Sequence, residues 1–209
     1  MVDRQHPRRP AVLDAAGAEL IEGDVDPAVA SELAHSTARV VVFGGGEDAE
    51  DAELAGRLVA LVDSEGLDSV AELWSRSPAT TLPGALWRVY LVREWLRRAP
   101  ETIAERFRDG VERTEASGAE EDLELVPDPD EVSRVADDLF AGRSGPIDTL
   151  FERVASFLRV LAAGAVPEPE WVTHDDELAS VVTRRAGSLV ATAEELELVA
   201  ETARAGRLD

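Results

Sequence analysis

The chain has 209 residues, of which 44% are apolar, enough for one domain with a substantial core. It has no cysteine, which excludes disulfides and cysteine-ligated zinc, and its 21 basic residues are all arginine, which excludes the lysine of a P-loop. The formal net charge of −22 argues against direct binding of nucleic acid, because such binding sets arginine and lysine against phosphate.

Residues 1–9 are predicted to form a flexible arm, and residues 10–209 a single all-α domain of about eight helices. The arm is basic, but no apolar run follows it, and no run in the chain approaches the length of a membrane span. We therefore expect a cytoplasmic protein that does not contact membranes. The first helix is predicted over 11–21 and ends before Gly23.

Asp26-Pro27 predicts the start of a second helix, with an N-cap followed by proline at the first position. Residues 39–43 (RVVVF) are ambiguous, because a β-branched run before three glycines also resembles the start of a nucleotide-binding βα unit. The GxGxxG fingerprint is missing, and acidic residues follow where a phosphate would sit, so a helix is favoured and a strand is left open. This helix is predicted to carry Val29, Ala30, Leu33, Thr37 and Val41.

An amphipathic helix is predicted over 52–62, and Asp68 is predicted to cap a short helix after it. The helix over 82–98 follows, capped by Thr80 or Thr81. Its first half is apolar on all sides, which is typical of a helix enclosed by its neighbours. We expect it to be the buried central helix of the domain.

A charged surface helix is predicted over 101–116, and the acidic segment 117–130, which contains glycine and proline, is a linker candidate where a hinge is left open. The later helices are each predicted to begin at a capping residue or a proline, at Asp128, Pro146, Thr173 and Thr192. The caps at Asp128 and Thr192 are each followed three residues later by glutamate, as in a capping box.

Arginine beside tryptophan in an acidic protein makes the helix over 82–98 the candidate site. The plainer interpretation is a core in which each arginine pairs with an acid or stacks on a ring. The alternative is an anionic or carboxylate-bearing ligand held by arginine against an aromatic wall. The candidate ligand-binding residues are Trp87, Arg88, Tyr90, Arg93 and Trp95.

A weaker alternative is a metal site. The pairs Glu47-x-x-Glu50 and Glu65-x-x-Asp68 match the carboxylate spacing by which all-α nucleotide pyrophosphatases of the MazG type hold Mg²⁺ for attack of water on a phosphate. One residue in five is acidic, however, so matches by chance are expected. A glycine also falls within the second pair, where it favours a break in the helix that must present both carboxylates.

Other catalytic sites are not predicted. A helical phosphohydrolase of the HD type would need more histidine near the pair His174-Asp175 than the distant His35 supplies. No serine has an arguable histidine partner. We therefore predict no catalytic residue, no resident metal and no cofactor.

One stretch resembles the core of a family of small all-helical proteins from high-GC actinobacteria. The resemblance covers about residues 65–115 and is weaker near the C-terminus. No activity is assigned to that family, so the resemblance implies only a cytoplasmic bacterial protein with a shared central helix. The matching residues are Leu73, Trp74, Pro78, Leu82, Pro83, Gly84, Ala85, Leu86, Trp87, Arg88, Tyr90, Leu91, Arg93 and Trp95.

The sequence favours a non-enzymatic helical binding or regulatory module. Its acidic surface is expected to meet a basic protein partner, or the chain to associate with itself. A decoy for a basic DNA-binding surface is a special case of this expectation. The alternatives from other classes are a small-ligand-binding protein with a pocket on the helix over 82–98, and a Mg²⁺-dependent nucleotide pyrophosphohydrolase.

Overall fold

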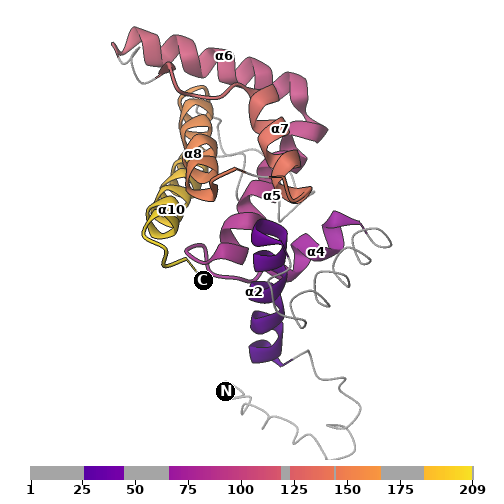
Figure 1. Cartoon of the computed structure of the whole chain (residues 1–209). Coiled ribbons are helices and arrows are strands. Elements are labelled where there is room, and N and C mark those ends of the chain that lie inside the picture. Colours follow the sequence, from indigo (N-terminus) through magenta and orange to yellow (C-terminus); the bar gives the residue numbers. More distant parts are fainter. Residues whose placement is uncertain (1–25, 45–65, 119–122, 144, 166–185, 209) are drawn as a thin grey trace, which may run out of the picture.

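The structure is a computed structural model that describes residues 26–44, 66–118, 123–143, 145–165 and 186–208 (Figure 1). These residues form seven helices and no strand, so the predicted all-α class is confirmed for them. The predicted arm over 1–9, the helices over 11–21 and 52–62, and the helix start at Thr173 lie outside the described residues. The single domain and the hinge stay predictions.

The seven helices follow one another with short connections wherever the chain between them is described. No helix within the described ranges is long and apolar enough to cross a membrane. The helices are α2 (Pro27–Phe43), α4 (Leu67–Trp74), α5 (Leu82–Arg98), α6 (Pro100–Ala116), α7 (Pro129–Phe140), α8 (Ile147–Ala163) and α10 (Ala186–Arg204).

Side-chain caps fix the beginnings of three helices, as the sequence predicts. The Asp26 carboxylate accepts a hydrogen bond from the amide of Ala28 at the start of α2. Thr81 accepts one from the amide of Gly84 in α5, at 3.4 Å. The carboxylate of Asp128 accepts one from the amide of Glu131 in α7, at 2.7 Å. Each cap satisfies an amide that the helix itself leaves without a carbonyl partner.

The strand left open at 39–43 is wrong, because these residues continue α2 to its end at Phe43. The Gly44 amide closes the last turn by donating to the Val40 carbonyl at 2.9 Å. Gly44 has φ +75°, a left-handed conformation that suits glycine at a helix end. The βα unit of a nucleotide-binding fold therefore has no first strand here.

Two predicted caps are also wrong. Asp68 lies within α4, whose N-cap is Gly66. Thr192 lies in the middle of α10, where its hydroxyl donates to the Ser188 carbonyl one turn earlier. The helix continues through this point because Leu189, Thr192 and Leu196 are all buried, and α10 packs along α8 over its length. Packing thus overrides a capping pattern that is correct in isolation.

The core is made by side chains of all seven described helices, and α5 contacts each of the other six. The large side chains of Trp74, Phe151 and Phe157 are fully buried, as are several leucines. Figure 1 shows α8 and α10 side by side and α6 lying across the ends of α7 and α8. The N-terminal half of α2 extends beyond the other described helices, and residues 26–33 are all exposed.

Candidate functional site

Arg88 joins α5 to α10. Its Nε donates to a carboxylate oxygen of Glu195 at 2.5 Å, and a terminal nitrogen donates to the Gly84 carbonyl at 2.9 Å. Its side chain is only 17% exposed. An arginine buried to this degree needs such partners, because desolvation of an unpaired guanidinium is costly. A ligand bound to Arg88 would have to replace Glu195.

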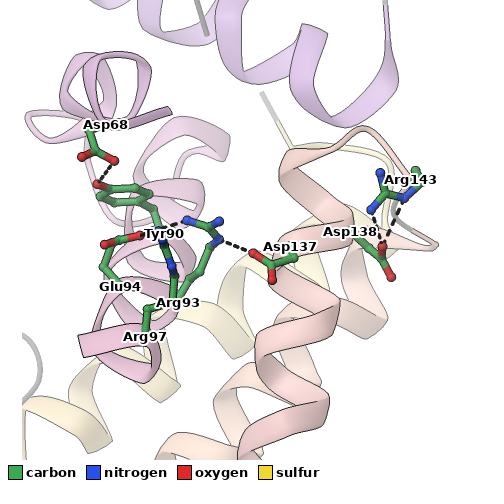
Figure 2. Close-up of polar contacts among 8 residues, drawn as sticks. All are labelled: Asp68, Tyr90, Arg93, Glu94, Arg97, Asp137, Asp138 and Arg143. Carbon is green, nitrogen blue, oxygen red and sulfur yellow. Dashed lines mark hydrogen bonds and ion pairs between the residues drawn. The ribbon is translucent and has the colours of Figure 1, made fainter. Parts of the chain in front are cut away.

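Arg93 joins α5 to α7. Its Nε donates to Asp137 at 2.5 Å, and a terminal nitrogen donates to the neighbouring Glu94 at 2.9 Å (Figure 2). Two carboxylates from two helices therefore hold one guanidinium. As at Arg88, an incoming anion would have to compete with carboxylates of the protein itself for the guanidinium of Arg93.

Glu94 is the buried acid at the centre of this arrangement, and its residue is 9% exposed. One carboxylate oxygen accepts from Arg93 and from Arg97, the latter at 3.0 Å, and the other lies 3.5 Å from Nε of Arg98. Sequence reasoning did not single out Glu94 as the acid that these arginines share. The signal was present, because arginines three and four residues later lie on the same helical face as a carboxylate.

Tyr90 joins α5 to α4. Its hydroxyl donates to the exposed carboxylate of Asp68 at 2.8 Å (Figure 2). Burial of the phenol raises the pKa of Tyr90 above its ordinary range, and the hydrogen bond to the negative Asp68 raises it further. Tyr90 is therefore held as a neutral donor, and Asp68 is used in a contact between helices.

The aromatic rings divide into two groups. Trp87 stacks on Tyr90 with ring centroids 5.5 Å apart, and Tyr90 meets Phe140 edge to face at 6.3 Å. Trp95 is on another side of the helix, where the Arg106 guanidinium lies 5.7 Å from the centre of its ring. The five candidate ligand-binding residues therefore contact different partners within the protein.

The arginines of this cluster are paired with carboxylates. Arg93, Arg97 and Arg98 share the carboxylate of Glu94, and Arg93 also pairs with Asp137. The cluster thus holds α5 to α7 by an ion pair, and Tyr90 holds α5 to α4 by a hydrogen bond.

The metal alternative is described only in part. Asp68 accepts the hydroxyl of Tyr90, whereas Glu47, Glu50 and Glu65 lie outside the described residues. His174 and Asp175 are also outside them. His35 bonds through its Nδ1 to the carbonyl of Ser31, one turn earlier in α2. In the part of the chain that the structure describes, no three acidic, histidine or cysteine side chains group as a metal site would require.

The exposed face of α2 is the feature that sequence reasoning missed most. Val29 and Leu33 are 55% and 40% exposed, and Phe43 at the end of the helix is 64% exposed. The face turned to the core has the buried side chains of Ala34, Thr37 and Ala38 at its centre, and the partly buried valines 40–42 also pack against the core. Trp74 fixes that inner face, because its indole nitrogen donates to the Thr37 hydroxyl at 3.0 Å.

A hollow of about 390 Å³ runs along the exposed side of α2. Its described lining mixes charged, polar and apolar groups, so it offers both hydrogen bonds and apolar contact to an occupant. The described residues that line it are Glu32, His35, Ser36, Arg39, Val40, Phe43 and Gly44.

Comparison of the chain with protein-family models, with curated proteins and with solved structures returned no match. Its role is therefore inferred from the contacts, burial and charges described above.

Proposed function

We propose that the protein is a non-enzymatic helical binding module that binds another protein through the exposed face of α2. The observation that carries the proposal is the exposure of Val29, Leu33 and Phe43 on a helix whose opposite face is already buried. Full burial of a side chain of this kind is worth about 1.5–3 kcal/mol. A partner that covered all three would gain a substantial part of its binding free energy there.

The spacing of this face fits a helical partner. Val29, Leu33, Ser36, Val40 and Phe43 follow one another at intervals of four, three, four and three residues. Ser36 and Val40 are half-buried, and Val40 also packs against the core at the edge of this face. The interval pattern is the spacing at which one α-helix packs along another, because it keeps the side chains on one slowly winding stripe. An amphipathic helix that lies along a helix face is a recurrent mode of protein recognition. We call these five residues the α2 seam.

The charge of the chain indicates which helices it would attract. A net charge of −22 repels acidic segments and favours encounter with basic ones. The same charge disfavours nucleic acid, in line with the expected absence of such a partner. The proposed occupant of the α2 seam is therefore an amphipathic protein helix whose polar face is not acidic overall.

The network on α5 supports this role as a scaffold. The inner face of α2 packs on α4 and α5, and the ion pairs of Arg93 and the hydrogen bond of Tyr90 hold α5 to α7 and α4. We accordingly propose α5 as the centre of the eight-helix domain, with α2 presented from it. The small-ligand pocket on α5 is the less favoured function, since its arginines already hold carboxylates.

A binding experiment with a defined probe tests the proposal. The probe is a fluorescent basic amphipathic peptide of about 20 residues with leucine at heptad spacing. Anisotropy with the full chain at about 0.15 M salt is expected to show saturable binding. Leu33→Asp should weaken it at least about tenfold, because a charge would be buried in the seam.

Leu198→Asp is the matched control, because Leu198 is an exposed leucine of α10 and the change in net charge is identical. Its affinity for the peptide should equal that of the unmodified chain. Equal weakening by both variants would reveal attraction by charge alone and would overturn the α2 seam as the binding face. Absence of binding by the unmodified chain would also overturn it.

A further inference from the structure

Two oppositely charged side chains, those of Glu32 and Arg39, lie along one side of the α2 seam. Their positions indicate which helix would pack against it. With Leu33 and Val40 at the a positions of a heptad, Val29, Ser36 and Phe43 occupy d positions. Glu32 and Arg39 then both occupy g positions, one heptad apart. Both are exposed, and both line the hollow along α2.

The charges beside the α2 seam of one copy are complementary to those of a second copy in antiparallel orientation. In an antiparallel pair of helices, the g positions of one helix face the g positions of the other. If Val29 packs against Val40 of the second copy, and Leu33 against Ser36, then each Glu32 lies opposite the second copy's Arg39. The two-fold axis generates the pair twice, as expected of an isologous interface.

Other registers do not form these pairs. In a parallel pair, g positions face e positions, so Glu32 would face Thr37 and Arg39 would face Gly44. Moving the antiparallel pair by one heptad would set the two copies of Arg39 against each other. Only the register with four layers, from Val29 to Val40, places Glu32 of each copy opposite Arg39 of the other, and both ion pairs then lie along the same side of the seam.

We infer that the partner of the α2 seam is a second copy of this chain, packed α2 against α2 in antiparallel orientation, with Glu32 and Arg39 forming two reciprocal ion pairs. The inference depends on the proposed function, since it names the occupant of the same face. The four layers form a small interface, and in two of them Ser36 packs against Leu33 of the other copy, so the association is expected to be weak and concentration-dependent. The net charge of each copy opposes it and is screened at about 0.15 M salt.

Charge reversal followed by mixing tests this inference. Sedimentation equilibrium of the full chain from about 5 to about 200 μM is expected to show a reversible monomer–dimer equilibrium. Glu32→Arg should weaken the dimer at least about tenfold, because like charges then face each other twice, and Arg39→Glu should do the same. An equimolar mixture of the two variants should restore the dimer, because the two positive charges of one chain meet the two negative charges of the other.

Glu201→Arg, an exposed charge reversal on α10, is the control and should leave the dimerisation constant unchanged. A dimer that survives both single reversals, or a mixture that does not recover it, would overturn the inference. A chain that is monomeric throughout would overturn it too. If that monomer still bound the basic peptide through Leu33, the proposed binding function would stand with a different partner.

The third candidate occupant of the α2 seam is another part of the same chain. Hydrogen exchange of the α2 amides at low and high protein concentration distinguishes it, because a second copy protects them only at high concentration. Equal protection at both concentrations, in a chain that sediments as a monomer, would overturn both proposals together.

Discussion

Gly110 of α6 packs directly on the backbone of α8, so that a Cβ atom at this glycine would lie 2.1 Å from the carbonyl oxygen of Val160. The reverse contact is equally close, since a Cβ at Gly164 would lie 1.9 Å from the carbonyl oxygen of Arg106. Nε of Arg106 donates to the carbonyl of Leu161 at 2.9 Å across the same crossing. Because Gly110 and Gly164 have no side chains, α6 can cross α8 with their backbones in direct contact.

Gly110→Ala should therefore destabilise the fold by about 1–3 kcal/mol, because α6 and α8 must move apart to admit a methyl group. Chemical denaturation monitored by circular dichroism measures the free energy of unfolding. Gly187→Ala is the control, since nothing lies within 4 Å of a Cβ there. In that helical position alanine should be neutral or stabilise by up to about 1 kcal/mol. A neutral Gly110→Ala would show that the helices are farther apart.

Glu94→Gln tests whether the buried carboxylate is what holds the three arginines of the network. The change keeps shape but removes the charge that Arg93, Arg97 and Arg98 share. The expected loss is about 1–3 kcal/mol of unfolding free energy, the range for hydrogen bonds to charged groups. Glu201→Gln on the exposed side of α10 should change it by less than about 0.5 kcal/mol. Equal effects would mean that the network adds nothing to stability.

Thr37→Val tests how α2 is fixed to α4. The hydroxyl of Thr37 accepts the buried indole N–H of Trp74 and donates to the carbonyl of Leu33 in its own helix. Valine has nearly the same shape, but it leaves the indole N–H unpaired, which should cost about 1–3 kcal/mol. The hydroxyl of Thr202 donates to the Leu198 carbonyl one turn earlier and, within the described residues, accepts no indole N–H. Thr202→Val should therefore cost less than about 0.5 kcal/mol, and a similar loss in both variants would contradict the role of the indole.

Helix starts were the part of the fold that the sequence predicted best. Each of the three correct caps accepts a hydrogen bond from an amide two or three residues later, at Asp26, Thr81 and Asp128. The neighbouring sequence is therefore enough to predict them. Thr192 carries a similar local pattern and fails, because α8 buries the flanking residues of a continuous helix. The close approach at Gly110 depends on a helix that lies about 50 residues away, and no pattern near the glycine reveals it.

The candidate site was predicted in its residue types and not in its arrangement. Desolvation predicts that a partly buried arginine pairs with an acid. The acids that pair with Arg88 and Arg93 are Glu195 and Asp137, which lie on other helices and were not identified from the sequence. On α2, the sequence pattern named Val29 and Leu33 together with Thr37 and did not distinguish the exposed residues from the buried one. The helix turns Ala34 and Ala38 inward, where small side chains allow close packing against α4 and α5. Apolar periodicity identifies an apolar face of a helix but does not show which element packs against that face.

Tyr90 is the only tyrosine of the chain, so its ionisation can be followed by absorbance without interference from another phenol. Burial raises its pKa, and the hydrogen bond to Asp68 and the charge of that carboxylate add to the effect. The folded chain should therefore titrate at higher pH than the unfolded chain, whose tyrosine ionises near pH 10.

The sign of the effect on stability follows from that direction. The folded state holds the phenol proton more tightly than the unfolded state, so its contribution is fully present below about pH 10. It is lost as pH rises above that value, because the unfolded chain releases the proton first. Unfolding free energy measured by denaturant at rising pH should fall more steeply in the unmodified chain than in Tyr90→Phe, which cannot ionise there.

Asp68→Asn separates the two causes of the raised pKa. It removes the negative charge beside the phenol while Tyr90 remains buried, so the pKa should fall toward the ordinary value without reaching it. Asp130→Asn, an acidic residue in the first turn of α7, is a control of equal charge change and should leave the titration where it was. A titration curve that Asp68→Asn does not move would mean that the hydroxyl of Tyr90 has no bond to α4 in solution, and that α4 is held to α5 by apolar packing alone.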